Sequence, residues 1–219
     1  MCDDGFVVHG QCRLIILLFP LLLSCATTLP SRQYTQGSII DMGHYSVIGP
    51  PGGGWVVNIQ KGQGTVEFRK SNASQSTGLI DETALIKVFR NWIVDEKLKR
   101  LSEEEVANDY RNREEADMIW RGVMTGQYEL SDVKKDITMI GDKRVYLLSY
   151  KTLGWSKGSK GPTDHKVVGE AVLYLFFPAD FKERHFFYIF LINHSYLQGS
   201  LQKGDLTPII PVISSLKIK

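Results

Sequence analysis

The chain has 219 residues, of which 43% are hydrophobic and 23% are charged, and its formal net charge is +2. This composition is typical of a globular protein that forms its own core, and it excludes a largely disordered chain. So small a net charge gives no electrostatic footprint for nucleic acid, and we expect no nucleic-acid partner.

An apolar segment without a charge lies near the N-terminus, at Leu14–Leu23. A helix that crosses a bilayer needs about 20 apolar residues, so this segment is too short to span one. Arg13 precedes the segment and the small Ser24 follows it, which is the layout of a secretory signal peptide.

The segment ends in Leu22-Leu23-Ser24-Cys25, which resembles the lipobox of bacterial lipoproteins. This resemblance implies signal cleavage between Ser24 and Cys25, a diacylglycerol on the Cys25 sulfur, and acylation of the new amino group. Two or more acyl chains hold a protein stably on a membrane. A plain secretory signal and an uncleaved buried segment are the alternatives that the residues leave open.

The lipobox defines the expected organisation of the chain: a signal peptide over residues 1–24, a lipidated N-terminus and tether over 25–42, and one domain over 43–219. Ala26 follows the cysteine where an Asp marks inner-membrane retention in Gram-negative lipoproteins. The resemblance therefore implies the periplasmic face of the outer membrane in a Gram-negative cell, and the outer face of the plasma membrane in a Gram-positive one.

The first part of the domain predicts a hairpin. Trp55–Ile59 and Thr65–Arg69 have the composition and alternation of strands, and a Gly-Gln-Gly turn separates them. The glycine-rich run before Trp55 precedes a strand and lacks the pattern of a phosphate-binding loop, so we interpret it as a structural turn.

Two helices are expected next. Asp81 has the character of an N-cap, and apolar residues follow at helical spacing, at Leu85, Val88, Phe89, Trp92 and Ile93. Ser102 and Glu105 form a capping box that predicts the start of a second, highly charged helix. That helix is either a solvated surface helix or a partner-binding face.

The rest of the chain predicts mostly strands. They are expected at residues 133–140, 144–150, 167–178 and 185–193, with a loop over 154–162 and a final short helix over 206–215 near Pro208. The two apolar strands, 167–178 and 185–193, have the composition of central strands buried on both faces. These elements predict an α+β fold, a mostly antiparallel sheet with helices packed on one face. Their order, and the ending of a helix followed by SLKIK, is similar to PsbP/Mog1-like domains, which implies a binding or assembly role.

The sequence carries no catalytic, cofactor-binding or metal-binding motif that we can assign. The histidines that follow Cys25 are His44, His165, His185 and His194, and none belongs to a zinc-binding pattern. We expect His185 and His194 at opposite ends of one strand, as strand-edge or solvent-exposed side chains. We therefore expect no cofactor and no metal.

A basic loop is the one candidate surface-contact feature of the domain. It contains the residues Lys151, Trp155, Lys157, Lys160, His165 and Lys166. Lysines around an exposed aromatic ring suit anionic lipid or cell-wall polymer, whereas a solvated hairpin loop is the simpler interpretation.

Taken together, these features predict a lipid-anchored protein of the bacterial cell envelope with a non-catalytic binding, accessory or assembly role. Its expected partners are the membrane, through Cys25, and an envelope protein. The alternative is a lipid-anchored envelope hydrolase or small-ligand-binding enzyme whose site is assembled from scattered residues.

Overall fold

The computed structural model describes residues 37–73, 80–158, 161–198 and 209–219. The predicted signal peptide, Cys25 and most of the predicted tether lie outside these residues. The first strand, β1 (Ile39–Asp41), lies entirely within the 25–42 range and pairs with β2 (Tyr45–Ile48), so the last residues of the predicted tether belong to the fold.

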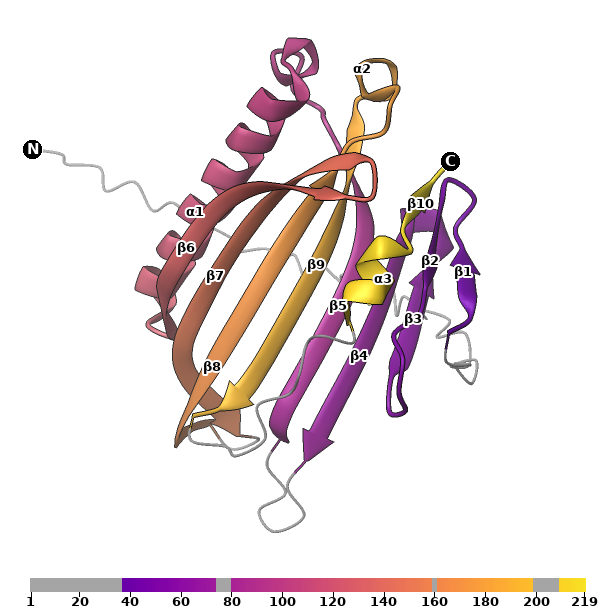
Figure 1. Ribbon diagram of the computed structural model, residues 1–219. Helices are drawn as coiled ribbons and strands as arrows, with labels where there is room; N and C mark the ends of the chain where they lie inside the picture. The colour runs from indigo at the N-terminus through magenta and orange to yellow at the C-terminus, as the bar shows by residue number, and fades with distance from the viewer. Residues whose placement is uncertain (1–36, 74–79, 159–160, 199–208) are drawn as a thin grey trace, which may run out of the picture. The chain divides into compact units, whose positions relative to one another are not determined.

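The centre of the fold is a seven-stranded sheet in which every neighbouring pair is antiparallel (Figure 1). In sheet order its strands are β3 (Val56–Gln60), β4 (Thr65–Ala73), β5 (Ile80–Trp92), β9 (Phe186–Leu197), β8 (Gly161–Phe176), β7 (Lys143–Gly158) and β6 (Tyr128–Ile140). The β3–β4 hairpin and the strands of the second half of the chain confirm the sequence-based predictions.

Short elements complete the domain. A second sheet has the order β1-β2-β10, where β10 is Lys217–Ile218. The helices are α1 (Glu103–Thr125), α2 (Phe181–Arg184) and α3 (Ile210–Ser214), with short 3₁₀ turns at Lys61–Gln63 and Leu98–Arg100. The final helix is confirmed, with Pro211 in its first turn; Pro208 lies outside the described residues.

The core consists of two clusters on opposite faces of the large sheet. Successive side chains of a strand point to opposite faces, and β9 illustrates this: Tyr188 and Phe190 belong to one cluster, and Phe187 and Ile189 to the other. The first cluster also takes in buried residues of β2 and α3. The second includes Val106 and Ala107 of α1.

These layers confirm the α+β class and the mostly antiparallel sheet. The long helix α1 packs on one face, over β6 and β7. The small sheet and the short helix α3 belong to the cluster on the other face. Strand β9 lies at the centre of the sheet, as its continuous apolar run predicts.

The helix predicted from Asp81 to Ile93 is wrong, because this segment forms strand β5. Antiparallel neighbours pair with β5 on both sides, β4 and β9. Ile86 and Val88 are buried in one cluster while Phe89 packs against the other, so both faces of the strand are apolar. A strand that is apolar on both faces imitates helical spacing, and here the two-sided pairing decides the structure.

The loop predicted over 154–162 is also wrong. Strand β7 continues to Gly158 and β8 begins at Gly161, with Trp155 paired to Lys166 and Lys157 paired to Pro162. The glycines of this stretch suggest a loop in the sequence, but the long hairpin continues through them with a register shift between Trp155 and Lys157.

Candidate functional site

Helix α1 begins as the sequence predicts. The Ser102 hydroxyl accepts a hydrogen bond from the Glu105 N–H at 3.3 Å, and the Glu105 carboxylate accepts one from the Ser102 N–H at 2.8 Å. The Ser102 hydroxyl also donates to this carboxylate, at 2.7 Å, and the two hydrogen bonds that the carboxylate accepts from Ser102 lower the pKa of Glu105. A carboxylate in the first turn also interacts favourably with the positive end of the helix dipole.

A buried arginine in the middle of α1 fixes the helix to the sheet. Arg111 is 3% exposed, and its Nη1 donates to the backbone carbonyls of Asp136 and Leu147, at 2.9 and 3.0 Å. Its guanidinium carbon also lies 5.6 Å from the centre of the Tyr146 ring. The hydrogen bonds connect α1 to β6 and β7, and this connection sets where the C-terminal end of the helix lies.

The C-terminal end of α1 is apolar yet open to solvent. Four of its side chains are largely exposed: Ile119 (48%), Trp120 (62%), Val123 (76%) and Met124 (64%). The helix ends at Thr125 and is capped by Gly126, whose left-handed backbone conformation (φ 57°) suits glycine. A cluster of exposed apolar residues of this kind marks an interaction surface in soluble domains.

The end of α1 approaches the sheet closely because glycines lie at the contact. The Tyr128 hydroxyl donates to the Met118 carbonyl at 2.9 Å. A Cβ on Gly154 would lie 2.5 Å from the Gln127 carbonyl oxygen, and one on Gly122 would lie 2.9 Å from the backbone carbonyl oxygen of Tyr128. Gly122 therefore permits the helix end to pack directly against β6, and Gly154 permits the turn after the helix to pack against β7.

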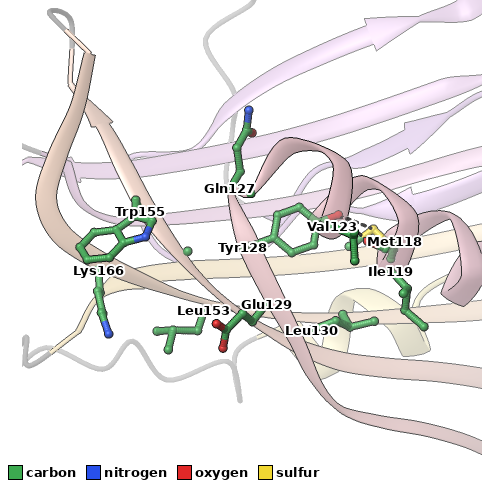
Figure 2. A pocket seen from close by; sticks show the side chains of 13 residues that line it. Met118, Ile119, Val123, Gln127, Tyr128, Glu129, Leu130, Leu153, Trp155 and Lys166 are labelled. Atoms are coloured by element: carbon green, nitrogen blue, oxygen red, sulfur yellow. Dashed lines mark hydrogen bonds between the residues drawn. The ribbon is translucent and has the colours of Figure 1, made fainter.

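A pocket with a volume of about 540 Å³ lies at this junction (Figure 2). Most of its wall is apolar, from Met118, Ile119, Val123, Tyr128, Leu130 and Leu153. Trp155, Lys166 and Glu129 also line it, and the Lys166 ammonium lies 5.4 Å from the centre of the Trp155 ring. Apolar walls with a few polar groups are characteristic of ligand pockets.

The structure brings together only part of the predicted surface-contact loop. Trp155 and Lys166 line the pocket, and His165 is exposed next to Lys166. Lys151 lies further along β7, where its ion pair with Asp132, at 3.1 Å, raises its pKa. Lys157 is paired through its backbone within the β7–β8 hairpin, and Lys160 lies outside the described residues.

Sequence reasoning did not find the helical half of the pocket. The signal was present in the abrupt change after Asp117, where an acidic helix continues as Met118-Ile119-Trp120. An apolar helix end usually indicates core packing, so sequence alone does not reveal that these side chains remain exposed.

The expectation of solvent-exposed histidines is wrong for His194. This side chain is 1% exposed, and its Nε2 lies 2.7 Å from a carboxylate oxygen of Glu82 on the neighbouring strand β5. Side chains alternate between the two faces along β9, so His194 lies on the same face as Tyr188, Phe190 and Ile192, which explains its burial. His185 directly precedes β9, whereas His194 lies within the strand, with three strand residues after it, so the two histidines bracket only part of β9.

The His194–Glu82 pair belongs to a polar row across one end of the sheet. Asn72 donates to the second oxygen of Glu82 at 2.8 Å, and the Tyr196 hydroxyl donates to Glu170 at 3.3 Å. His194 Nδ1 is buried and has no hydrogen-bond partner among the described residues. The imidazole does not line the pocket, so the two features are separate.

Among the described residues, no group of three or more histidine, cysteine or acidic side chains is placed to hold a metal ion. Within the same part of the chain, no helix combines the length and the apolar character needed to cross a bilayer.

The fold defines an α+β domain built on an antiparallel sheet. No protein-family model matches the sequence, and a search of curated proteins finds no match. Among solved structures, the chain is similar to the solution structure of cyanobacterial PsbP (CyanoP) from Synechocystis sp. PCC 6803. The two are 14% identical, with a TM-score of 0.45, over 86% of this chain and 96% of that one.

Proposed function

We propose that this protein is a lipid-anchored lipoprotein of the bacterial cell envelope that acts by binding, as an accessory or assembly factor. The observation that supports a binding role is the apolar pocket at the end of α1, whose lining includes the exposed side chains of Val123 and Trp155. Trp120 and Met124 are exposed on the same end of the helix. Aromatic and methionine side chains are enriched where proteins bind partners. The proposed anchor rests on the lipobox-like Leu22–Cys25 sequence.

The proposed lipid anchor is tested by intact mass spectrometry of the N-terminal peptide from a membrane fraction. We expect a mature chain that begins at Cys25 and carries diacylglycerol. The matched control is Cys25→Ser, which we expect to retain residues 1–24 and to lose the lipid mass. A wild-type chain with an unmodified Cys25 would contradict the anchor.

The proposed binding role of the C-terminal end of α1 is tested by photo-crosslinking in intact cells. A photoreactive amino acid at Val123, which is 76% exposed beside the pocket, is compared with the same amino acid at Val94, which is 84% exposed and does not line it. We expect a discrete adduct from position 123 alone. Equal adducts from both positions would show that the helix end has no particular binding role.

A further inference from the structure

We propose that the pocket at the end of α1 binds a single-chain zwitterionic amphiphile, of the lysophospholipid class with an ethanolamine head group. The acyl chain lies along the apolar wall, the phosphate faces Lys166, and the head-group ammonium faces Glu129. This inference names the ligand class of the site that underlies the proposed binding role, and it rests on that role.

The wall and size of the pocket match an acyl chain. Its volume of about 540 Å³ lies within the range of small-molecule sites, about 300–1,000 Å³. Met118, Ile119 and Val123 line it from the helix, and Leu130 and Leu153 from β6 and β7 (Figure 2). Methionine adapts to the shape of a flexible chain, and every buried methylene stabilises the complex by about 0.8 kcal/mol.

The two charged groups of the pocket select the head group. Lys166 on β8 and Glu129 on β6 both line the pocket, and neither takes part in an ion pair within the described ranges. The Lys166 ammonium lies over the Trp155 ring, a position that keeps it beside the apolar wall. A phosphate accepts hydrogen bonds from this ammonium, which is a charge-assisted and therefore stronger interaction.

Glu129 makes the pocket favour a zwitterionic head group over an anionic one. A purely anionic head group near Lys166 would meet the carboxylate of Glu129 in the same pocket, and like charges repel. A head group with both a phosphate and an ammonium offers each side chain an opposite charge. The Trp155 ring, which is half exposed, suits the boundary between the apolar chain and the polar head group.

The test uses the full chain in its native membrane fraction and a lysophosphatidylethanolamine with a photoreactive group in its acyl chain. After irradiation, peptide mass spectrometry maps the labelled residues. We expect labelling at residues 118–130 and 153–155 that an excess of unlabelled lysophosphatidylethanolamine suppresses. Labelling that is spread evenly over the exposed surface, or that does not saturate, would overturn the proposal.

Substitutions test the wall and the head-group contacts. Val123→Asp places a charge against the acyl chain, and we expect labelling to fall about tenfold, whereas Val94→Asp leaves it unchanged. Glu129→Gln removes the preference for lysophosphatidylethanolamine over lysophosphatidylglycerol, and Lys166→Gln lowers labelling by both. If Val94→Asp lowers labelling as much as Val123→Asp, or if the preference for lysophosphatidylethanolamine persists in Glu129→Gln, the proposal is wrong.

The outcomes separate this inference from the proposed anchor. Saturable labelling of the pocket in a chain whose Cys25 carries no lipid would support the ligand site and contradict the anchor. A lipidated Cys25 together with unlabelled pocket residues would support the anchor and overturn the ligand site.

Discussion

The buried His194 on β9 pairs with the partly buried Glu82 on β5, with 2.7 Å between the carboxylate oxygen and Nε2. The two residues are adjacent in the sheet yet lie far apart in sequence, because β5 and β9 belong to different halves of the chain. The second carboxylate oxygen accepts a hydrogen bond from Asn72 on β4, so the pair connects three strands.

Removing the carboxylate of this pair should destabilise the domain. Glu82→Ala leaves both imidazole nitrogens of His194 buried without a partner among the described residues. We expect the free energy of unfolding to fall by about 2 kcal/mol, the cost of an unsatisfied buried polar group. Urea denaturation measures this, with the exposed Glu96→Ala as a control that should leave stability nearly unchanged. Equal effects of the two substitutions would show that the pair contributes nothing particular.

Arg111 should stabilise the domain through its hydrogen bonds to two backbone carbonyls. Arg111→Met keeps much of the side-chain length but leaves the Asp136 and Leu147 carbonyls without this donor. We expect a loss of about 2 kcal/mol in unfolding free energy. Arg113→Met, two residues along the same helix and largely exposed, is the matched control. Thermal unfolding followed by circular dichroism compares them, and an Arg111 variant as stable as the Arg113 variant would refute the role.

The contact between β7 and the turn that follows α1 should not tolerate a side chain at Gly154. An added Cβ would approach the Gln127 carbonyl oxygen to 2.5 Å, so the turn between α1 and β6 must move. We expect Gly154→Ala to lower the free energy of unfolding by about 2 kcal/mol and to change the fluorescence of Trp155. Gly62→Ala, where a Cβ meets nothing within 4 Å, should do neither. An unchanged tryptophan emission spectrum in Gly154→Ala, compared with Gly154→Ala/Trp155→Phe to isolate the contribution of Trp155, would contradict the close approach.

The capping box gives a prediction on pH. Hydrogen bonds from Ser102 lower the pKa of Glu105 in the folded protein, below the value of 4.5 that applies to the unfolded chain. The unfolded state therefore binds more protons in this range, and the stabilisation by the Glu105 charge is lost as the pH falls below 4.5. We expect wild type to be more stable than Glu105→Gln at pH 7, and the difference to disappear in acid.

Denaturation curves at a series of pH values from neutral to acidic check this expectation. Glu129→Gln, on an exposed residue of β6, controls for the general effect of removing one acid. A difference between wild type and Glu105→Gln that stays constant down to the lowest pH would rule out the charge of Glu105 as its source.

The sequence predicts those parts of the fold that local chemistry determines. The β3–β4 hairpin follows from turn residues between alternating strands, and the start of α1 from the capping residues Ser102 and Glu105. Strand β5 could not be predicted in this way. Its apolar spacing fits a helix equally well, and only pairing with β9, far away in sequence, decides between the two.

The pocket was predictable only in part. Trp155 and Lys166 are recognisable as a pair of functional interest, but their association with Met118 and Val123 depends on how α1 packs against the sheet. The burial of His194 could be inferred more easily, because alternation along the strand puts it on the same face of β9 as Tyr188 and Phe190. Neither the partner Glu82 nor its distance could be read from the chain, since they depend on strand order.

The strand order also bears on how the protein folds. Strands β3 to β5 form one meander of neighbours in sequence, β6 to β9 form another, and the pairing of β5 with β9 joins them. Phe89 and Ile189 meet across this seam, which closes a loop that contains α1 and three strands. Closing so long a loop costs entropy before any contact compensates it, and such topologies fold slowly. Until the seam closes, β5 and β9 present unpaired edges, and at that stage the chain is most prone to aggregate.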